Sequence, residues 1–416
     1  MDCQSCYCLL SPISYLWFKP MVFEGCHKKS NPYLSIYKTP FLKNMAFSFR
    51  KFSKRFFILA NVVLILFFLM GGTLPYLGHS NWPWLGFLGL AFPYLLVCVL
   101  GFLIFWLIAK PRIALLPLLA VLLCWKQVAV TFRFSKAVFD YRKAATSLRL
   151  MSWNVKVFEG IAKGPQASSE AKNEIISFIK AAGPDIICLQ EFSQLDSSGE
   201  DNNHIKRMMD AGYPHYYYSA DYERVSRGYR SGSAIFSKLP LLSPQRVPFT
   251  SNRESIAFAD VVKGTDTFRI FTTHLQSFKF NKADYRNLED IKNKGDLATE
   301  QSKNLVSKMK NGFELRGMQA QQIRPLLDSC PYPEIICGDF NDVPNSYVYW
   351  HVRGSRRDAF MEKGNGLGRT FISLAPTLRI DYIMCDNRIK VAQFAIADKR
   401  FSDHLPLLVD VLIEKK

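Results

Sequence analysis

Two long segments without a charged residue constrain this chain more than any other feature. Phe56 to Leu77 is 22 residues long and Trp82 to Ala109 is 28, and neither contains Asp, Glu, Lys or Arg. About 20 apolar residues in a helix cross the hydrocarbon core of a bilayer, and tryptophans near the ends of the second segment suit a membrane interface. A secretory signal peptide has one shorter apolar run. We therefore predict at least two transmembrane helices.

A third apolar segment, Ile113 to Trp125, is shorter and is followed by Lys126. Extended to about Phe132, it is long enough to cross if the lysine side chain reaches back to the interface. The alternative is a buried or re-entrant helix. The sequence thus predicts a membrane region over residues 56–132 with two or three transmembrane helices, which follows a basic, disordered leader over residues 1–55.

The excess of basic residues belongs mostly to this first third of the chain. Residues 1–147 hold 16 of the 53 Lys and Arg but only 3 of the 35 Asp and Glu. The rest of the chain is therefore nearly balanced in charge. A protein that attracts nucleic acid through its net charge carries the excess on its folded domain, so the overall basicity does not argue for nucleic acid.

The same charges predict how the chain crosses the membrane. Basic residues at positions 50, 51, 54 and 55 precede the first segment, and Lys110 and Arg112 separate the second from the third, whereas residues 78–81 carry none. The positive-inside rule then places the N-terminus and Lys110–Arg112 in the cytoplasm. With three crossings, the rest of the chain lies on the non-cytoplasmic side, as we expect. Basic residues at 133, 136, 142 and 143, which follow the third segment, instead favour the cytoplasm. If the third segment does not cross, the part of the chain that follows it lies in the cytoplasm.

After a linker over residues 133–147, apolar strand-like runs end in polar residues. Ile335-Ile336-Cys337 is followed by Gly338-Asp339-Phe340-Asn341. An uninterrupted apolar run suits a strand that is covered on both faces, and the glycine permits a turn after it. The carboxylate of Asp339 and the carboxamide of Asn341 are able to orient a water molecule beside a phosphate oxygen.

The same pattern recurs along the chain. Asn154 ends the run from Leu150, Glu191 ends the run from Ile186, and His274 ends the run from Phe271. Asp381 lies in a further strand pattern, and Ser402-Asp403-His404 precede the last strand-like run, Leu405 to Leu412. Asp and Asn after a strand are commonly turn formers, and a single histidine is commonly structural. Six such positions in one domain instead predict an active site at the edge of a sheet.

This ordered set resembles the endonuclease/exonuclease/phosphatase superfamily, which includes DNase I-like nucleases, abasic-site endonucleases, sphingomyelinases and inositol-phosphate phosphatases. The resemblance covers residues 148–416 and implies a four-layer α/β (α+β) sandwich, in which two mixed β-sheets lie face to face between outer helices. Helical patterns such as Glu170–Ala182 and Arg316–Ser329 alternate with the strand-like runs, as in layered α/β proteins.

The resemblance also implies a role for each polar residue. Asp339 would orient or deprotonate the attacking water, Asn341 would bind a phosphate oxygen, and His404, held by Asp381, would stabilise the developing charge. His274 would be a second phosphate contact or an acid. Glu191, with Asn154 and Asp403, would hold Mg²⁺ or Mn²⁺, which are hard cations that prefer oxygen ligands. Arg230 is a further candidate for a phosphate contact.

These expectations describe a membrane-anchored, metal-dependent hydrolase of phosphodiesters, with the lipid bilayer and a phosphodiester as partners and no protein partner predicted. We expect a nuclease, although Val155-Lys156-Val157-Phe158 departs from the Asn-Gly-Leu-Arg continuation typical of abasic-site endonucleases. One alternative is a lipid-headgroup phosphodiesterase or phosphatase, which a membrane anchor would hold at its substrate. The other is a non-catalytic membrane binding protein, because fold alone does not determine function.

Overall fold

The chain forms two compact units. The computed structural model describes residues 40–78, 82–135, 138–158, 160, 165–195, 203–294 and 300–413. The first unit runs up to Met70 and includes Phe92–Trp125, and the second contains Gly71–Ala91 and everything from Lys126 onward. Of the predicted leader, residues 1–39 lie outside the described residues, as do residues 79–81 of the uncharged loop.

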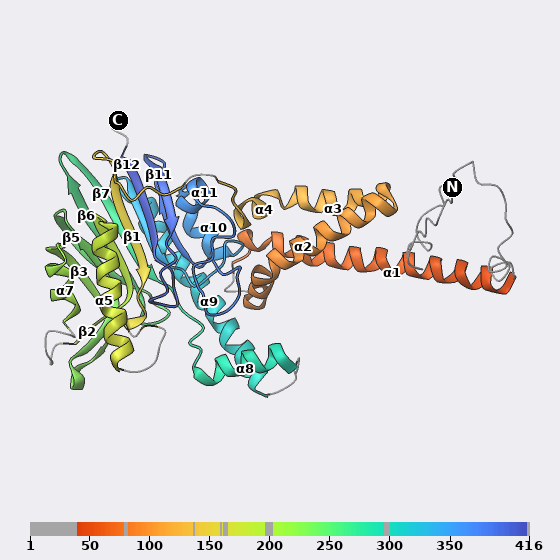
Figure 1. The fold of residues 1–416 in the computed structure, drawn as a ribbon, viewed down its shortest axis with the longest axis horizontal. Coiled ribbons are helices and arrows are strands. Elements are labelled where there is room, and N and C mark those ends of the chain that lie inside the picture. Colours follow the sequence, from red (N-terminus) through yellow and green to blue (C-terminus); the bar gives the residue numbers. More distant parts are fainter. Residues whose placement is uncertain are drawn as a thin grey trace, which may run out of the picture. The chain divides into compact units, whose positions relative to one another are not determined.

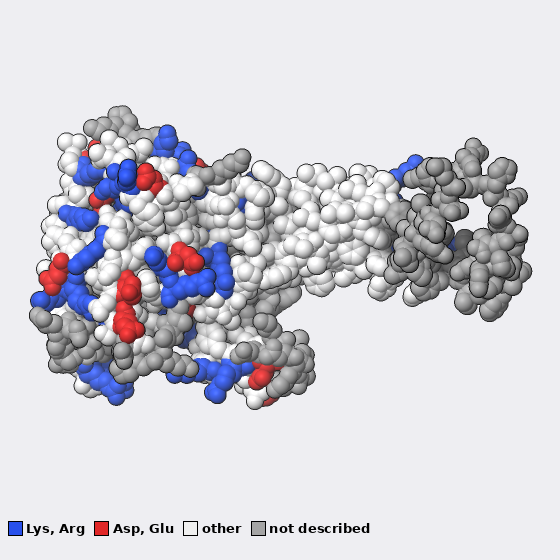
Figure 2. Space-filling model, viewed as in Figure 1, with Lys and Arg blue, Asp and Glu red and all other residues white. Residues whose placement is uncertain are grey.

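The first unit consists of apolar helices. They are most of α1 (Pro40–Gly72), α2 (Gly86–Ala109) from Phe92 onward, and α3 (Pro111–Leu123). The short α4 (Trp125–Thr131) follows α3 and belongs to the second unit from Lys126 onward. Lys51–Tyr76 and Pro83–Ala109 are long and apolar enough to cross a membrane, and α3 with α4 adds a third candidate that bends by 71°. The middle of these helices shows neither basic nor acidic residues on its visible surface (Figure 2), and residues such as Leu66 and Ile104 are each 60% exposed.

The predicted leader is corrected in one respect, because α1 begins at Pro40. Residues 40–55 are therefore helical rather than disordered. Between Pro40 and Gly71 no proline or glycine interrupts the chain. Once an apolar helix is formed, adding residues at its end is far easier than nucleating a new helix, so the basic segment continues the helix of the apolar segment that follows it.

The second unit is built on two mixed six-stranded sheets that lie face to face (Figure 1). The first sheet has the order β11-β12-β1-β2-β4-β3, formed by Ile389–Ile396, Leu407–Ile413, Leu148–Asn154, Ile186–Leu195, Tyr229–Ser237 and His215–Arg224. The second has the order β5-β6-β7-β8-β10-β9, formed by Leu241–Pro248, Ser255–Lys263, Asp266–His274, Glu334–Asp339, Asp381–Cys385 and Arg357–Asp358. Within each sheet one neighbouring pair is parallel, β1 with β2 and β7 with β8.

The core lies between the sheets because alternate residues of each strand face inward. Leu150 and Cys188 of the first sheet and Ile270 and Cys337 of the second belong to one fully buried cluster. Their sequence neighbours face outward and are buried by helices, which explains why the strands read as unbroken apolar runs.

Helices cover both outer faces. The first sheet packs on α5 (Pro165–Ala182), where Ile175 and Ile179 join Met151 and Ile187 in one cluster, and α7 (His204–Asp210) adds Met208. The second sheet packs on α9 (Glu300–Asp328) and α10 (Tyr347–Arg353). The remaining helices are α8 (Lys282–Lys294) and α11 (Ala359–Lys363). The predicted four-layer sandwich is therefore confirmed, and two predicted helices correspond to α5 and the last part of α9.

Two segments that sequence reasoning assigned elsewhere pack into this second unit. In the predicted linker over residues 133–147, Arg133 and Gly366 exchange backbone hydrogen bonds of 2.9 and 2.7 Å. In the turn between α1 and α2, the Gly71 carbonyl accepts a hydrogen bond from Asn345 Nδ2 at 3.1 Å. The Phe87 ring lies 5.4 Å from that of Phe313 in α9. The end of α1 and the start of α2 thus form part of the second unit.

Candidate active site

The two parallel strand pairs bring four of the predicted residues together. Parallel strands end at the same edge of a sheet, so Asn154 at the end of β1 lies level with Gln190 of β2, next to Glu191. In the other sheet, His274 at the end of β7 pairs with Asp339 at the end of β8. Antiparallel β10 then places Asp381 opposite Asp339. The edges of the two sheets meet here, and hydrogen bonds join residues of both.

The Gly338–Asn341 turn depends on its glycine. Gly338 has φ of 141°, and a Cβ atom added to it would lie 2.0 Å from the backbone oxygen of Thr273, so no other residue fits. Asn341 has φ of 53°, which non-glycine residues rarely adopt. Its backbone N–H donates to Asp339 Oδ1 at 2.8 Å and its Nδ2 donates to the Leu275 carbonyl at 2.9 Å. The second hydrogen of Nδ2 remains for a ligand.

Glu191 is directed into the site by a β-bulge. The register between β2 and β4 shifts between Leu189 and Phe192, and Glu191 within this shift has φ of 48°. Bulges of this kind re-aim side chains and are common beside active sites. Asn154 Nδ2 joins the two sheets, because it donates to Glu191 Oε1 at 3.1 Å and to Asp339 Oδ2 at 3.0 Å.

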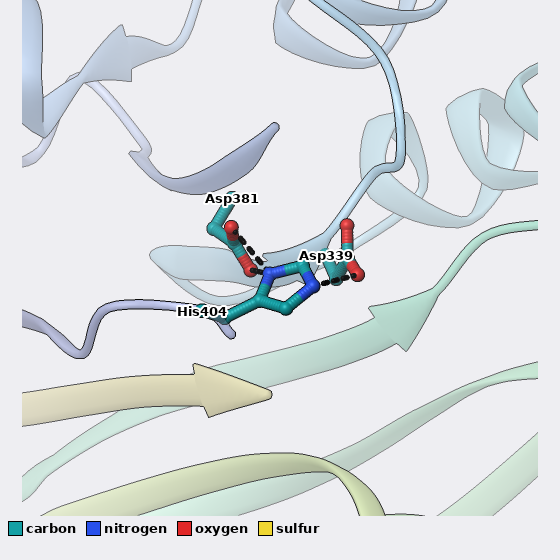
Figure 3. Close-up of side chains that lie close together, drawn as sticks. All are labelled: Asp339, Asp381 and His404. Atoms are coloured by element: carbon teal, nitrogen blue, oxygen red, sulfur yellow. Dashed lines mark hydrogen bonds and ion pairs between the residues drawn. The ribbon is translucent and has the colours of Figure 1, made fainter. Parts of the chain in front are cut away.

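His404 lies between two carboxylates (Figure 3). Its Nδ1 is 2.9 Å from Asp381 Oδ2 and its Nε2 is 3.6 Å from Asp339 Oδ2. All three side chains are buried. Burial lowers the pKa of His404, but the Asp381 and Asp339 carboxylates outweigh burial and raise that pKa to about 10. The imidazole is therefore positively charged at neutral pH and held in one orientation by Asp381.

Asp339 remains ionised at neutral pH despite its burial. Burial raises its pKa, the Asp381 carboxylate adds to this effect, and the His404 and His274 rings oppose it, which leaves the pKa at about 6. A buried carboxylate with two cationic neighbours and a pKa just below neutrality suits a group that accepts a proton from water.

His274 is held by a residue that the sequence analysis did not identify. Its Nδ1 lies 3.4 Å from Glu254 Oε2, and its Nε2 lies 3.7 Å from Glu191 Oε1 and 3.6 Å from Asp339 Oδ2. Burial lowers the pKa of His274, but Glu254 and the other carboxylates raise it to about 10. Nε2 is buried and has no hydrogen-bond partner among the described residues, and it faces the carboxylates of Glu191 and Asp339.

Asp339, Glu191, Asn341, His404 and Asp403 line one pocket of about 420 Å³. Asp403 differs from the others because Lys156 Nζ lies 2.9 Å from its Oδ2. A cation that used Asp403 as a ligand would have to compete with this ion pair. The lysine is a second residue that sequence reasoning missed, although it follows Asn154 by two positions.

The donors at this site fit a hard divalent cation. Glu191 and Asp339 both accept hydrogen bonds from the single atom Asn154 Nδ2, so two carboxylates and a carboxamide meet at one point, and oxygen donors of this kind suit Mg²⁺ or Mn²⁺. Asp339, Asp381 and His404 also offer ligand atoms within 4.8 Å of one another. In that trio, however, the His404 ring lies between the two carboxylates and already pairs with both (Figure 3).

Arg230 does not join this cluster. It lies in β4, opposite Gln194 of β2 and Glu223 of β3, and its guanidinium carbon lies 5.8 Å from the centre of the Tyr218 ring. It is not among the residues that line the pocket of Asp339 and His404. The structure therefore gives no support to the predicted phosphate contact, because the strand that carries Arg230 directs it toward a tyrosine of the same sheet.

Family models match both parts of the chain. Residues 151–404 match the model of the endonuclease/exonuclease/phosphatase family, and residues 54–131 match a domain of unknown function. A comparison with curated protein sequences finds no significant match.

Several solved structures are similar to this chain over the same part. An endonuclease/exonuclease/phosphatase from Beutenbergia cavernae is 21% identical, with 65% of this chain and 72% of that chain covered and a TM-score of 0.47. The human Nocturnin catalytic domain is 18% identical, with 64% and 95% covered and a TM-score of 0.45. Sphingomyelinase C from Streptomyces griseocarneus is 16% identical, with 64% and 99% covered and a TM-score of 0.44.

Proposed function

Because the chain belongs to the endonuclease/exonuclease/phosphatase family, we propose that it is a membrane-anchored, divalent-metal-dependent hydrolase of phosphodiester bonds. The observation that carries this proposal is the buried group of Asp339, His404 and Asp381, joined through Asn154 to Glu191. His404 and His274 lie within 4 Å of four carboxylates, those of Asp339, Asp381, Glu191 and Glu254. A structural role alone does not account for this group, since burying charges costs free energy.

In the proposed reaction, water attacks phosphorus and one P–O ester bond breaks. Asp339 accepts the proton of the attacking water. The His404 imidazolium, held by Asp381, stabilises the negative charge that develops on the phosphoryl oxygens. Asn341 binds a phosphate oxygen through its remaining amide hydrogen. His274 is charged at neutral pH, so it either contacts the phosphate or donates a proton to the leaving alkoxide.

Glu191 and Asn154 are the proposed holders of Mg²⁺ or Mn²⁺, and Asp403 joins them only if its ion pair with Lys156 opens. When bound, the cation supplies a Lewis acid that withdraws charge from the phosphoryl oxygens. The bulge at Glu191 and the hydrogen bond from Asn154 orient the carboxylate before any cation arrives.

Glu191→Gln is therefore expected to weaken metal binding more than it changes any other property of the enzyme. The amide keeps the shape of the side chain but removes a charged ligand, so the metal concentration at half-maximal activity should rise about tenfold or more. Titration of activity against Mg²⁺ and Mn²⁺ measures this shift. Glu254→Gln, which removes the partner of His274, serves as the control and should leave the metal concentration largely unchanged. An unchanged metal requirement in Glu191→Gln would remove this residue from the proposed ligands.

The anchoring is proposed from the two apolar helices together with the packing of the turn between them. Residues 71–91 belong to the same compact unit as the catalytic domain. If α1 and α2 each cross a membrane, this turn and the catalytic domain lie on the same side of it. The chain then returns from Lys110–Arg112 to that side, so α3 and α4 together make a third crossing. With the positive-inside rule, the catalytic domain is non-cytoplasmic.

A pair of reporter fusions tests this topology. A reporter fused after residue 112 is expected to give a cytoplasmic signal and one fused after residue 145 a non-cytoplasmic signal. A non-cytoplasmic signal after residue 112 together with a cytoplasmic signal after residue 145 would show that the topology is the reverse of the one proposed. Two cytoplasmic signals would mean that the third segment does not cross.

The substrate was expected from sequence to be nucleic acid, and this stays a prediction. One observation favours the lipid-headgroup alternative instead. The pocket that contains Asp339 is also lined by apolar side chains, and one of them, Leu90, belongs to α2. Turnover of the purified full chain on DNA, RNA and phospholipid vesicles, with Mg²⁺ or Mn²⁺, separates the alternatives. Absence of turnover on every phosphate ester would favour the non-catalytic alternative.

A further inference from the structure

The pocket has two chemically different sides. Its polar side holds Glu191, Asp339, Asn341 and His404, and its apolar side includes Leu90, Val343, Phe371 and Leu374. A volume of about 420 Å³ is within the range of small-molecule sites. It accommodates a phosphate with its headgroup and the first part of a hydrocarbon chain, and longer chains must continue outside it.

The apolar side is a continuous packed surface. Val343, Phe371 and Ile380 form one buried cluster, and Leu90 and Leu378 pack against it. Val343 follows the Asp339–Asp342 loop directly, so the apolar side begins four residues from the proposed general base. We call these five residues together with Leu374 the apolar wall. Leu374 is 42% exposed and lies on the same pocket.

The apolar wall leads to a membrane-type helix. Leu90 lies in the segment Pro83–Ala109, which is long and apolar enough to cross a membrane. The same turn of α2 packs closely on the catalytic unit, because a Cβ atom added to Gly89 would lie 3.0 Å from the Asn345 carbonyl oxygen. The first turns of this helix thus contribute Leu90 to the lining of the catalytic pocket.

The charges of the pocket do not suit a nucleic acid strand. Such a strand is held by cations that track several phosphates. Besides the His404 imidazolium, three Lys and Arg side chains line this pocket, and two of them are committed to ion pairs: Lys156 with Asp403 at 2.9 Å and Arg316 with Asp342 at 3.2 Å. Lys279 is the one lining cation without an ion pair among the described residues. Four carboxylates line the same pocket, those of Glu191, Asp339, Asp342 and Asp403.

We infer that the substrate is a bilayer phospholipid whose phosphodiester lies at Asp339 and His404 while the start of its hydrocarbon lies on the apolar wall. This inference rests on the proposed function and identifies the substrate class of the same site. Leu90 at the start of α2 offers the hydrocarbon of this lipid an apolar contact beside the proposed phosphate position. Hydrolysis adds water across one P–O bond, and the apolar product remains in the bilayer.

The test uses the full chain reconstituted in vesicles of phosphatidylcholine, phosphatidylethanolamine, phosphatidylglycerol, phosphatidylinositol phosphate and sphingomyelin, with Mg²⁺ or Mn²⁺. Release of water-soluble products is compared with turnover of the soluble diester bis(4-nitrophenyl) phosphate and of DNA and RNA. Leu374→Asp places a charge on the apolar wall at an exposed position that tolerates it. We expect the ratio of lipid turnover to soluble-diester turnover to fall about tenfold or more. Leu90→Ala should lower the same ratio severalfold.

Leu242→Asp is the matched control, because Leu242 is 50% exposed on β5 and does not line the pocket. Its ratio should equal that of the unmodified chain. If Leu374→Asp left the ratio of lipid turnover to soluble-diester turnover unchanged, the proposed role of the apolar wall in lipid binding would be wrong. Cleavage of nucleic acid or of the soluble diester without lipid turnover would overturn the lipid inference but leave the proposed function intact. No turnover of any ester would overturn both.

Discussion

Replacing Asp339 by alanine is expected to lower kcat at least about 10³-fold while the domain stays folded. Asp339 lies 3.6 Å from both His404 and His274, and its pKa of about 6 keeps it ionised at neutral pH. It is the one carboxylate of the site that touches both histidines and Asn154. Its loss therefore removes the proposed proton acceptor and also a carboxylate that pairs with both histidines.

The measurement is the initial rate on bis(4-nitrophenyl) phosphate at saturating Mg²⁺ or Mn²⁺, with circular dichroism to check folding. Asp260→Ala is the matched control. Asp260 is also a buried aspartate of the second sheet, but it pairs with Arg269 at 2.6 Å, away from the pocket. Its loss should reduce stability and leave kcat nearly unchanged. A near-normal kcat in Asp339→Ala would mean that this cluster is not the active site.

Much of the site was predictable because it follows from a local pattern. A short, mostly apolar run that ends in a polar residue is visible in sequence, and parallel strands place such ends at one edge. Asn154, Glu191, His274 and Asp339 are all residues of this type, and the structure brings them together.

Other parts of the site depend on which strands become neighbours. Glu254 contacts His274 because β6 pairs with β7, and the sequence near Glu254 does not indicate that pairing. The predicted phosphate contact of Arg230 finds no support in the structure for the same reason. It precedes a polar Ser-Gly-Ser stretch that suggests a binding loop, but those residues lie within β4, between β2 and β3.

The start of α2 shows a further limit of sequence reasoning. Hydropathy assigns Pro83–Ala109 to a single apolar segment, and apolarity does not distinguish contact with lipid from contact with protein. The glycines of this turn are the one visible signal. Gly86 lies so close to the Phe313 ring that a Cβ atom would come within 2.5 Å of it. Glycines in an apolar helix indicate close packing against another part of the chain.

A double-mutant cycle on His404 and Asp381 is expected to show that the two residues act as one unit. His404→Ala should lower kcat about 10²- to 10⁴-fold, since it removes the cation that stabilises the developing charge. Asp381→Asn should cost less, because the ring remains and loses only the carboxylate, 2.9 Å from Nδ1, that orients it and raises its pKa.

The double variant should be no slower than His404→Ala alone, because Asp381 has no catalytic role once the ring is absent. The kcat values of the three variants and the unmodified chain complete the cycle. Asp358→Asn provides the comparison, since Asp358 is equally buried and lies on β9 beside β10, where it accepts a hydrogen bond from Tyr349. Its effect on kcat should be small and independent of His404. If the losses from His404→Ala and Asp381→Asn multiplied, Asp381 would act on the substrate directly rather than through the imidazole.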